Sequence, residues 1–395
     1  MSAAVSAATA VEATGSSETR LVMPSLPLTE RLRFAVVAFV WAKLLLKPMH
    51  LYSEAKKYFV SPGEKEPDLV KTYPVRKSLA VRIFFPPNYD RSTPSPRSAK
   101  LPTLLTIHGG GFVIGEPHNN DSWNRAFAKR HSFLVVALNY AKAPASPFPN
   151  AVHDIEALVA CVLADSTLPV DTERVALGGW SAGGNLALAA GSLPSLRGRV
   201  RAVVPFYPVV DFVPSFPAKA RARRYKPSLG GFRARETDFL LSMTDLFTWA
   251  YVPAGQRCDN PLLSPFYLSR ADLPPNVFMV ACELDMLSIE AWRMACKLAG
   301  KRVPGLDEVV GCQEPVGKGV LITEGDERFA WEVTLEDGSR YKWLLVPDTI
   351  HGFDQDHIGE FTKDPVLQED AQIKTAKVVD MVGQWLLDGP LKAEA

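Results

Sequence analysis

The chain lacks a net charge, a cysteine framework and a hydrophobic run long enough to cross a bilayer. Lys and Arg (44) nearly balance Asp and Glu (43), which leaves a formal charge of +1 over 395 residues. This balance predicts no broad electrostatic surface for nucleic acid. The five cysteines are odd in number and include no CxxC pair, so neither a disulfide framework nor a metal site is expected. Any chemistry must come from a local site.

The N-terminal region also lacks the features of a secretory signal, because it has neither a basic leader nor an apolar core. We therefore expect a cytoplasmic protein with a disordered tail over residues 1–30. Phe34–Leu46 is strongly apolar, but a spanning helix needs roughly 20 such residues. We expect this segment to pack on the protein or over a pocket. A helix lying on a membrane surface, with peripheral association, is the alternative.

From about Lys71 onward, short β-rich runs alternate with helical stretches. Continuous apolar runs such as Leu101–Ile107 are typical of parallel strands covered by helices on both faces, so the pattern predicts an α/β sheet. An insertion with its own helical stretch interrupts the pattern and predicts a cap. The other expected strands are Ser78–Phe85, Leu134–Leu138, Val175–Leu177, Val200–Phe206, Val277–Cys282 and the hairpin strands Arg328–Leu335 and Tyr341–Val346.

These observations divide the chain into a core and two cap segments. The predicted parts are the tail (1–30), an N-terminal helical cap segment (31–70), the first part of the core (71–210), the cap insertion (211–259) and the second part of the core (260–395), which includes an extra hairpin (327–346).

The strongest local motif is GWSAG, residues Gly179–Gly183, which matches G-x-S-x-G. It follows a predicted strand and precedes a helix-like stretch, which is the context that the motif requires. A nucleophile on such a sharp turn needs small neighbours, because the backbone closes tightly on both sides. The motif predicts Ser181 as a nucleophile.

A second motif, HGGGF, follows the predicted strand Leu101–Ile107. Consecutive glycines let backbone N–H groups approach a ligand closely. We expect the N–H groups of Gly110 and Gly111, with that of Ala182, to form an oxyanion hole. A phosphate-binding loop is the competing interpretation, but the Lys-Ser/Thr ending of a P-loop is absent.

The base and the acid are sought in the order that this architecture uses, Ser, then acid, then His. Of the seven histidines, only His351 and His357 follow the serine with room for an acid between. His351 follows a predicted strand and precedes a glycine, whereas His357 stands in an acidic stretch, so His351 is favoured. Asp285 follows the strand Val277–Cys282 and is the preferred acid. Glu283 is its near rival, and Glu290 is expected to face outward.

Together these residues resemble the hormone-sensitive-lipase-like branch of the α/β-hydrolases. The resemblance also covers Asn139–Pro144 and His351–Phe353, and extends over about Leu101–Trp385. It implies an eight-stranded, mostly parallel sheet with a helical cap, and carboxylester hydrolysis without a cofactor. The family often has Asp before its serine, where this chain has Trp180. The high proline content and the insertions of the chain also resemble those of fungal hydrolases of secondary metabolism.

The expected function is hydrolysis of an apolar ester or lactone through an acyl-enzyme. Phe112, Trp180 and Tyr207 are expected to contact this small-molecule substrate, together with apolar cap residues. Acyl transfer, or release of a product in secondary-metabolite biosynthesis, would use the same machinery and stays open. A non-catalytic ligand receptor on the same fold is the alternative from another class. The sequence also leaves a homodimer open.

Overall fold

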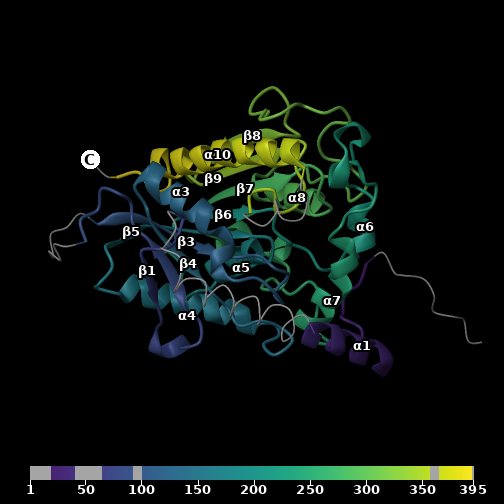
Figure 1. Ribbon diagram of the computed structural model, residues 1–395, viewed down its shortest axis with the longest axis horizontal. Helices are drawn as coiled ribbons and strands as arrows, with labels where there is room; N and C mark the ends of the chain where they lie inside the picture. The colour runs from purple at the N-terminus through teal and green to yellow at the C-terminus, as the bar shows by residue number, and fades with distance from the viewer. Residues whose placement is uncertain (1–18, 41–64, 92–99, 356–363, 394–395) are drawn as a thin grey trace, which may run out of the picture.

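A nine-stranded sheet forms the centre of the protein (Figure 1). The computed structural model describes residues 19–40, 65–91, 100–355 and 364–393. The strand order is β1-β2-β4-β3-β5-β6-β7-β9-β8. Pairings from β4 to β9 are parallel, whereas β1, β2 and β8 pair antiparallel. The strands are β1 (Leu69–Lys71), β2 (Val81–Phe84), β3 (Leu101–Ile107), β4 (Leu134–Leu138), β5 (Val170–Trp180), β6 (Ala202–Phe206), β7 (Asn276–Cys282), β8 (Ala330–Thr334) and β9 (Arg340–Val346).

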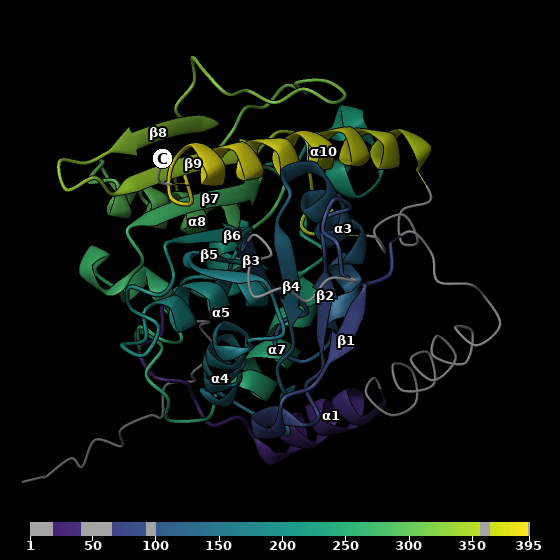
Figure 2. The same cartoon turned by 90° about the vertical axis from the view of Figure 1, so that its left-hand side faces the viewer.

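Helices cover both faces of this sheet, as Figure 2 shows. α3 and α10 pack together over one face, and α4, α5 and α8 contribute to the core on the other. The helices are α1 (Leu28–Phe39), α3 (Asp121–His131), α4 (Asn150–Ala164), α5 (Ala182–Gly191), α6 (Phe216–Ala220), α7 (Leu241–Tyr251), α8 (Ser288–Leu298) and α10 (Pro365–Asp388). The chain therefore has the α/β architecture that its alternating pattern predicts.

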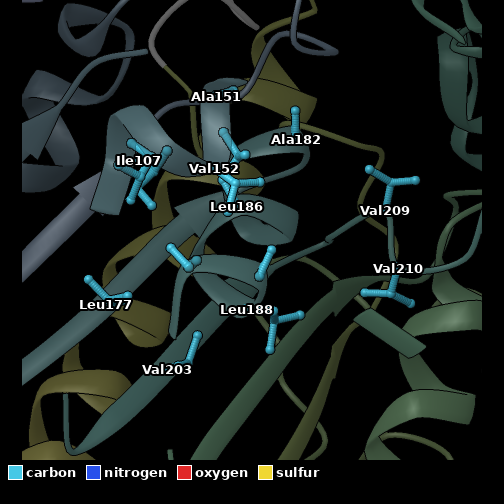
Figure 3. Packing of buried hydrophobic residues seen from close by; sticks show 14 of the residues in the cluster. Ile107, Ala151, Val152, Leu177, Ala182, Leu186, Leu188, Val203, Val209 and Val210 are labelled. Carbon is cyan, nitrogen blue, oxygen red and sulfur yellow. The ribbon is translucent and has the colours of Figure 1, made fainter. Parts of the chain in front are cut away.

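The buried parts of the central strands are largely apolar because both of their faces are covered. Leu105 and Ile107 of β3 join the core beneath α4 and α5, whereas Leu104 joins the core beneath α3 and α10. Figure 3 shows Ile107 of β3, Leu177 of β5 and Leu186 of α5 as parts of the same core. A strand that alternated apolar and polar residues could not fill both layers.

The sheet has nine strands, which corrects the predicted eight. The additional strand is β1, which has three residues, two of them exposed, and pairs with β2 at the edge of the sheet. A short exposed strand needs no apolar run, so composition carries no sign of it. At the opposite edge, β8 and β9 form the antiparallel hairpin that the sequence predicts.

The cap insertion contains α6 and α7, which lie with α1 at one end of the sheet (Figure 1). α1 packs on α7 through Phe34, whose ring centroid is 5.6 Å from that of Trp249. The start of the apolar segment Phe34–Leu46 is therefore part of a helix on the cap. Residues 41–46, like residues 1–18 of the predicted tail, lie outside the described residues. No helix in the described ranges combines the length and apolarity needed to cross a membrane.

Candidate active site

Ser181 occupies a sharp turn between β5, which ends at Trp180, and α5, which begins at Ala182. Its φ is 55° and its ψ is −117°, a strained conformation for a residue with a side chain. The flanking glycines are required by close contacts. A Cβ at Gly179 would lie 2.3 Å from the carbonyl oxygen of Gly183, and a Cβ at Gly183 would lie 2.1 Å from that of Ile107. The turn thus explains the G-x-S-x-G spacing.

Asp285 and His351 come from loops after the adjacent parallel strands β7 and β9. His351 Nδ1 lies 2.7 Å from Asp285 Oδ2, and both side chains are buried. The structure therefore brings together the predicted base and acid. His351 and Ser181 line the same cavity. His357 lies outside the described residues.

The surroundings of His351 favour its protonated form. Burial lowers the pKa of the imidazole, but the charge and hydrogen bond of Asp285 outweigh this effect, with additional contributions from Asp238 and Asp354. The net pKa is raised above the ordinary value. A base that is stabilised as its cation can accept a proton from Ser181 more readily.

The HGGGF loop borders the same cavity. Gly110 and Gly111 have φ of 110° and 58°. A Cβ at Gly110 would lie 2.1 Å from the carbonyl oxygen of Ile114, so only glycine fits there. His108 anchors the loop, since its Nδ1 lies 2.7 Å from the Gly109 carbonyl oxygen and its ring stacks on Tyr140 at 4.4 Å. Burial lowers the pKa of His108 well below its ordinary value, so it is neutral and structural.

A cavity of about 430 Å³ opens above Ser181. Its walls are largely apolar, and the cap insertion contributes many of the residues that form them. The phenylalanines that line it are Phe112, Phe212, Phe216, Phe232, Phe239 and Phe247. The cavity therefore suits an apolar group next to the serine hydroxyl.

Two of the three predicted substrate contacts need correction. Phe112 lines the cavity, but Trp180 and Tyr207 are not among its lining residues and are fully buried. Trp180 stacks on Phe206 at 5.1 Å, in the core beneath α3 and α10. Because side chains alternate along a strand, the last residue of β5 points away from the layer that Ser181 faces. Tyr207 instead lies edge-on to His351, with ring centroids 4.6 Å apart.

The structure also reveals cap residues that the sequence did not single out. Asp238 Oδ2 accepts a hydrogen bond of 2.9 Å from the N–H of Met286 and lies 3.2 Å from Arg223 Nε. Arg223 Nε also donates to the carbonyl oxygen of Leu284 at 3.0 Å. These contacts hold both neighbours of Asp285. The basic run Lys219–Arg224 is visible in the sequence, but its partners are distant in the chain.

Glu290 does not face outward, which corrects the expectation for α8. It is fully buried, forms an ion pair with Lys219 of α6, and accepts a hydrogen bond of 2.8 Å from the N–H of Val210. The periodicity of a helix cannot identify such a residue, because the buried cation that partners it belongs to a different segment. Among the described residues, no cluster of three His, Cys, Asp or Glu side chains could hold a metal ion.

Comparisons with known proteins agree with this geometry. A family model described as the alpha/beta hydrolase fold matches residues 104–312, more than half of the chain. Ethyl acetate hydrolase from Pseudomonas putida is 32% identical over 263 residues, which is 61% of this chain and 75% of that protein. Human hormone-sensitive lipase is 33% identical over 103 residues, which is 25% of this chain and 9% of that protein. The chain spans less than two thirds of the length of the first curated relatives that it matches.

Solved structures give the same fold. A structure from a study of two fungal esterases of Rhizomucor miehei superposes with a TM-score of 0.58 at 21% identity, covering 93% of this chain and 99% of that chain. Identity at this level shows the fold alone. With the family model and the curated relatives, it establishes that the chain belongs to the α/β-hydrolase family, in its hormone-sensitive-lipase-like branch.

Proposed function

We propose that the protein is a serine carboxylester hydrolase that acts on an apolar ester or lactone through an acyl-enzyme. One observation carries this proposal. Ser181, the His351–Asp285 pair and the glycines of the HGGGF loop meet at one cavity with largely apolar walls. A non-catalytic receptor would have no need for a strained serine beside a hydrogen-bonded imidazole–carboxylate pair.

In the first half-reaction, the imidazole of His351 accepts the proton of Ser181 as its Oγ attacks the ester carbonyl carbon. Asp285 holds the Nδ1–H and stabilises the imidazolium that forms. The N–H groups of Gly110, Gly111 and Ala182 bind the tetrahedral oxyanion, and one such donor is worth roughly 10²–10³ in kcat. His351 then donates its proton to the leaving alcohol oxygen, which leaves an ester on Ser181.

In the second half-reaction, water replaces the alcohol. His351 takes a proton from water, whose oxygen attacks the acyl carbon, and returns it to Ser181 Oγ as the acid departs. A lactone follows the same steps, with the leaving hydroxyl retained on the released acid. This chemistry requires no cofactor.

The walls of the cavity support an apolar substrate. Polar groups buried without partners lose free energy, so a sugar or nucleotide would bind poorly against phenylalanine rings. The names of the relatives point the same way, since they include ethyl acetate hydrolase from Pseudomonas putida and an arylesterase from Saccharolobus solfataricus. The first name denotes a small uncharged ester, and the second denotes aryl esters.

The proposal is tested with p-nitrophenyl esters from acetate to palmitate and with an aliphatic δ-lactone, using the wild-type protein and Ser181→Ala. We expect the variant to lose at least about 10³-fold in kcat. We also expect a fluorophosphonate to label Ser181 in the wild type and not in the variant. Full turnover by Ser181→Ala, or no labelling of the folded wild type, would overturn the proposed function.

A further inference from the structure

Asp354 is a carboxylate beside the candidate site to which the proposed mechanism gives no role. It follows His351 by three residues and is partly buried. Trp180 Nε1 donates a hydrogen bond of 2.8 Å to its Oδ2, and the Tyr207 hydroxyl donates to its Oδ1. Both carboxylate oxygens are therefore occupied by donors from distant parts of the chain.

One donor belongs to the strand that leads to the nucleophile, and the other contacts the base. Trp180 is the residue before Ser181, at the end of β5. Tyr207 follows the end of β6, has a φ of 37°, and presents its ring to His351 at a centroid distance of 4.6 Å and an angle of 60°. Asp354 thus links the loop of the base to the turn of the nucleophile.

Both donors are neutral, so neither of them cancels the negative charge that Asp354 carries near the imidazole when it is ionised. Burial raises the pKa of Asp354 to about 6, although the hydrogen bonds from Tyr207 and Trp180 oppose the shift. Among the residues that the structure describes, the charged groups that face His351 are Asp285 from the loop after β7, Asp238 from the cap and Asp354 from its own loop. Cys282 of β7 and Tyr207 are further titratable groups near Asp354 in the described part of the chain.

We propose that Asp354 is a positioning residue, whose carboxylate ties Trp180 and Tyr207 to the loop of His351 and holds the imidazole in place for Ser181. This inference rests on the proposed function. The two donors bond to different oxygens of Asp354, and an amide would replace one of these acceptors with an NH₂ group that cannot accept. Its charge also stabilises the imidazolium that forms when the serine proton is transferred.

The test compares Asp354→Asn and Tyr207→Phe with the wild type on p-nitrophenyl butyrate. We expect Asp354→Asn to lower kcat by about tenfold to a hundredfold, because a small displacement of a catalytic group has an effect of that size, with KM nearly unchanged. The acid limb of kcat/KM should move to lower pH, since the charge that favours protonated His351 is removed. The rate of fluorophosphonate labelling should fall in parallel with kcat.

Tyr207→Phe keeps the ring against His351 and removes only the donor, so it serves if Asp354→Asn does not fold. We expect a smaller fall in kcat, and an effect that does not add to that of Asp354→Asn in the double variant, because both changes break the same link. Additive effects of the two substitutions would count against the link.

A matched indole–carboxylate pair lies elsewhere in the fold. Trp385 Nε1 donates a hydrogen bond of 3.0 Å to Glu332 Oε1, between α10 and β8. Trp385→Phe and Glu332→Gln should lower the melting temperature and leave kcat and the acid limb unchanged. If Asp354→Asn behaves like these controls, Asp354 has no positioning role and the inference is overturned, although Ser181-dependent turnover would still support the function. A wild type without such turnover would overturn both.

Discussion

Lys226 Nζ lies 2.8 Å from Glu283 Oε2, and neither side chain has any exposed surface. Glu283 also accepts hydrogen bonds of 2.8 Å from the N–H groups of Cys312 and Asp348. Asp285, two residues further on, is instead within 2.7 Å of His351. Lys226 belongs to the cap insertion, so the cap engages one of the two candidate acids and leaves the other to the imidazole.

This division of roles predicts that two conservative substitutions affect different properties, one the rate of turnover and the other the stability of the fold. Asp285→Asn should lower kcat by about 10⁴-fold, because the imidazole would be held in the wrong tautomer. Glu283→Gln should instead destabilise the protein by on the order of 3 kcal/mol, because it leaves Lys226 with only part of its counter-charge. Steady-state kinetics and urea unfolding measure the two effects. Loss of turnover in folded Glu283→Gln, with activity retained in Asp285→Asn, would reverse the assignment.

The proposed oxyanion role of the HGGGF loop predicts a substitution that lowers turnover and leaves substrate binding nearly unchanged. Gly110→Ala forces a Cβ to within 2.1 Å of the Ile114 carbonyl oxygen, so the loop must move. We expect kcat to fall by about 10²–10³-fold, as for the loss of an oxyanion donor, with little change in KM. Gly198→Ala is the control, because Gly198 also has a positive φ, 74°, but nothing lies within 4 Å of its added Cβ. Equal effects of the two changes on kcat would show that backbone strain alone is responsible.

The raised pKa of His351 predicts the pH dependence of the reaction. The base must be neutral to accept the serine proton, so kcat/KM rises as pH passes through its pKa. The acid limb should therefore lie above the value of about 6.5 for a free imidazole. Asp238→Asn should move this limb to lower pH, because Asp238 contributes to raising the pKa of His351. Asp326→Asn, in the loop before β8, should leave the pH of the acid limb unchanged. A wild-type limb at or below that of free imidazole would contradict the prediction.

Phe247 predicts how the cavity selects its acyl group. Its Cδ2 lies 2.2 Å from where a Cβ on Gly111 would be, so the ring packs directly on the HGGGF loop. We expect Phe247→Ala to raise the kcat/KM ratio of octanoate to butyrate esters by about tenfold or more, because the space it leaves accommodates further methylene groups. Phe34→Ala removes the packing of α1 on Trp249 of α7, so it should reduce the stability of the protein without changing this ratio. An unchanged ratio in Phe247→Ala would place the acyl group elsewhere.

The buried pair of Lys219 and Glu290 predicts a stability that depends on pH. Burial raises the pKa of Glu290 to about 7, while Lys219 opposes the shift. The folded protein therefore binds a proton that the unfolded chain has already released, so this group favours folding less as pH rises. Lys219→Met should destabilise the protein by about 3–5 kcal/mol when Glu290 is charged, and by less near pH 5 than near pH 8. Urea unfolding at both pH values measures this. Equal losses in the free energy of unfolding at the two pH values would contradict the prediction.

Much of the site could be predicted because its parts depend on local spacing. The G-x-S-x-G and HGGGF motifs describe turns whose glycines are required by contacts within a few residues or with the adjacent strand, as at Gly110 and Gly183. Ser181, Asp285 and His351 could be grouped from the sequence because a parallel sheet brings the carboxyl ends of β5, β7 and β9 to one edge. The short edge strand β1 could not be predicted, since two of its three residues are exposed.

The sequence by itself thus determined the α/β architecture, the turn that carries Ser181 and the set of residues from which a base and an acid could be drawn. Tertiary structure alone decided that Trp180 and Tyr207 face Asp354 rather than the cavity, and that Glu290 is buried against Lys219. It also gave Glu283 its partner in Lys226. The physical reason is distance along the chain. A buried charge or donor is satisfied by whatever the fold brings beside it, and no local pattern records that neighbour.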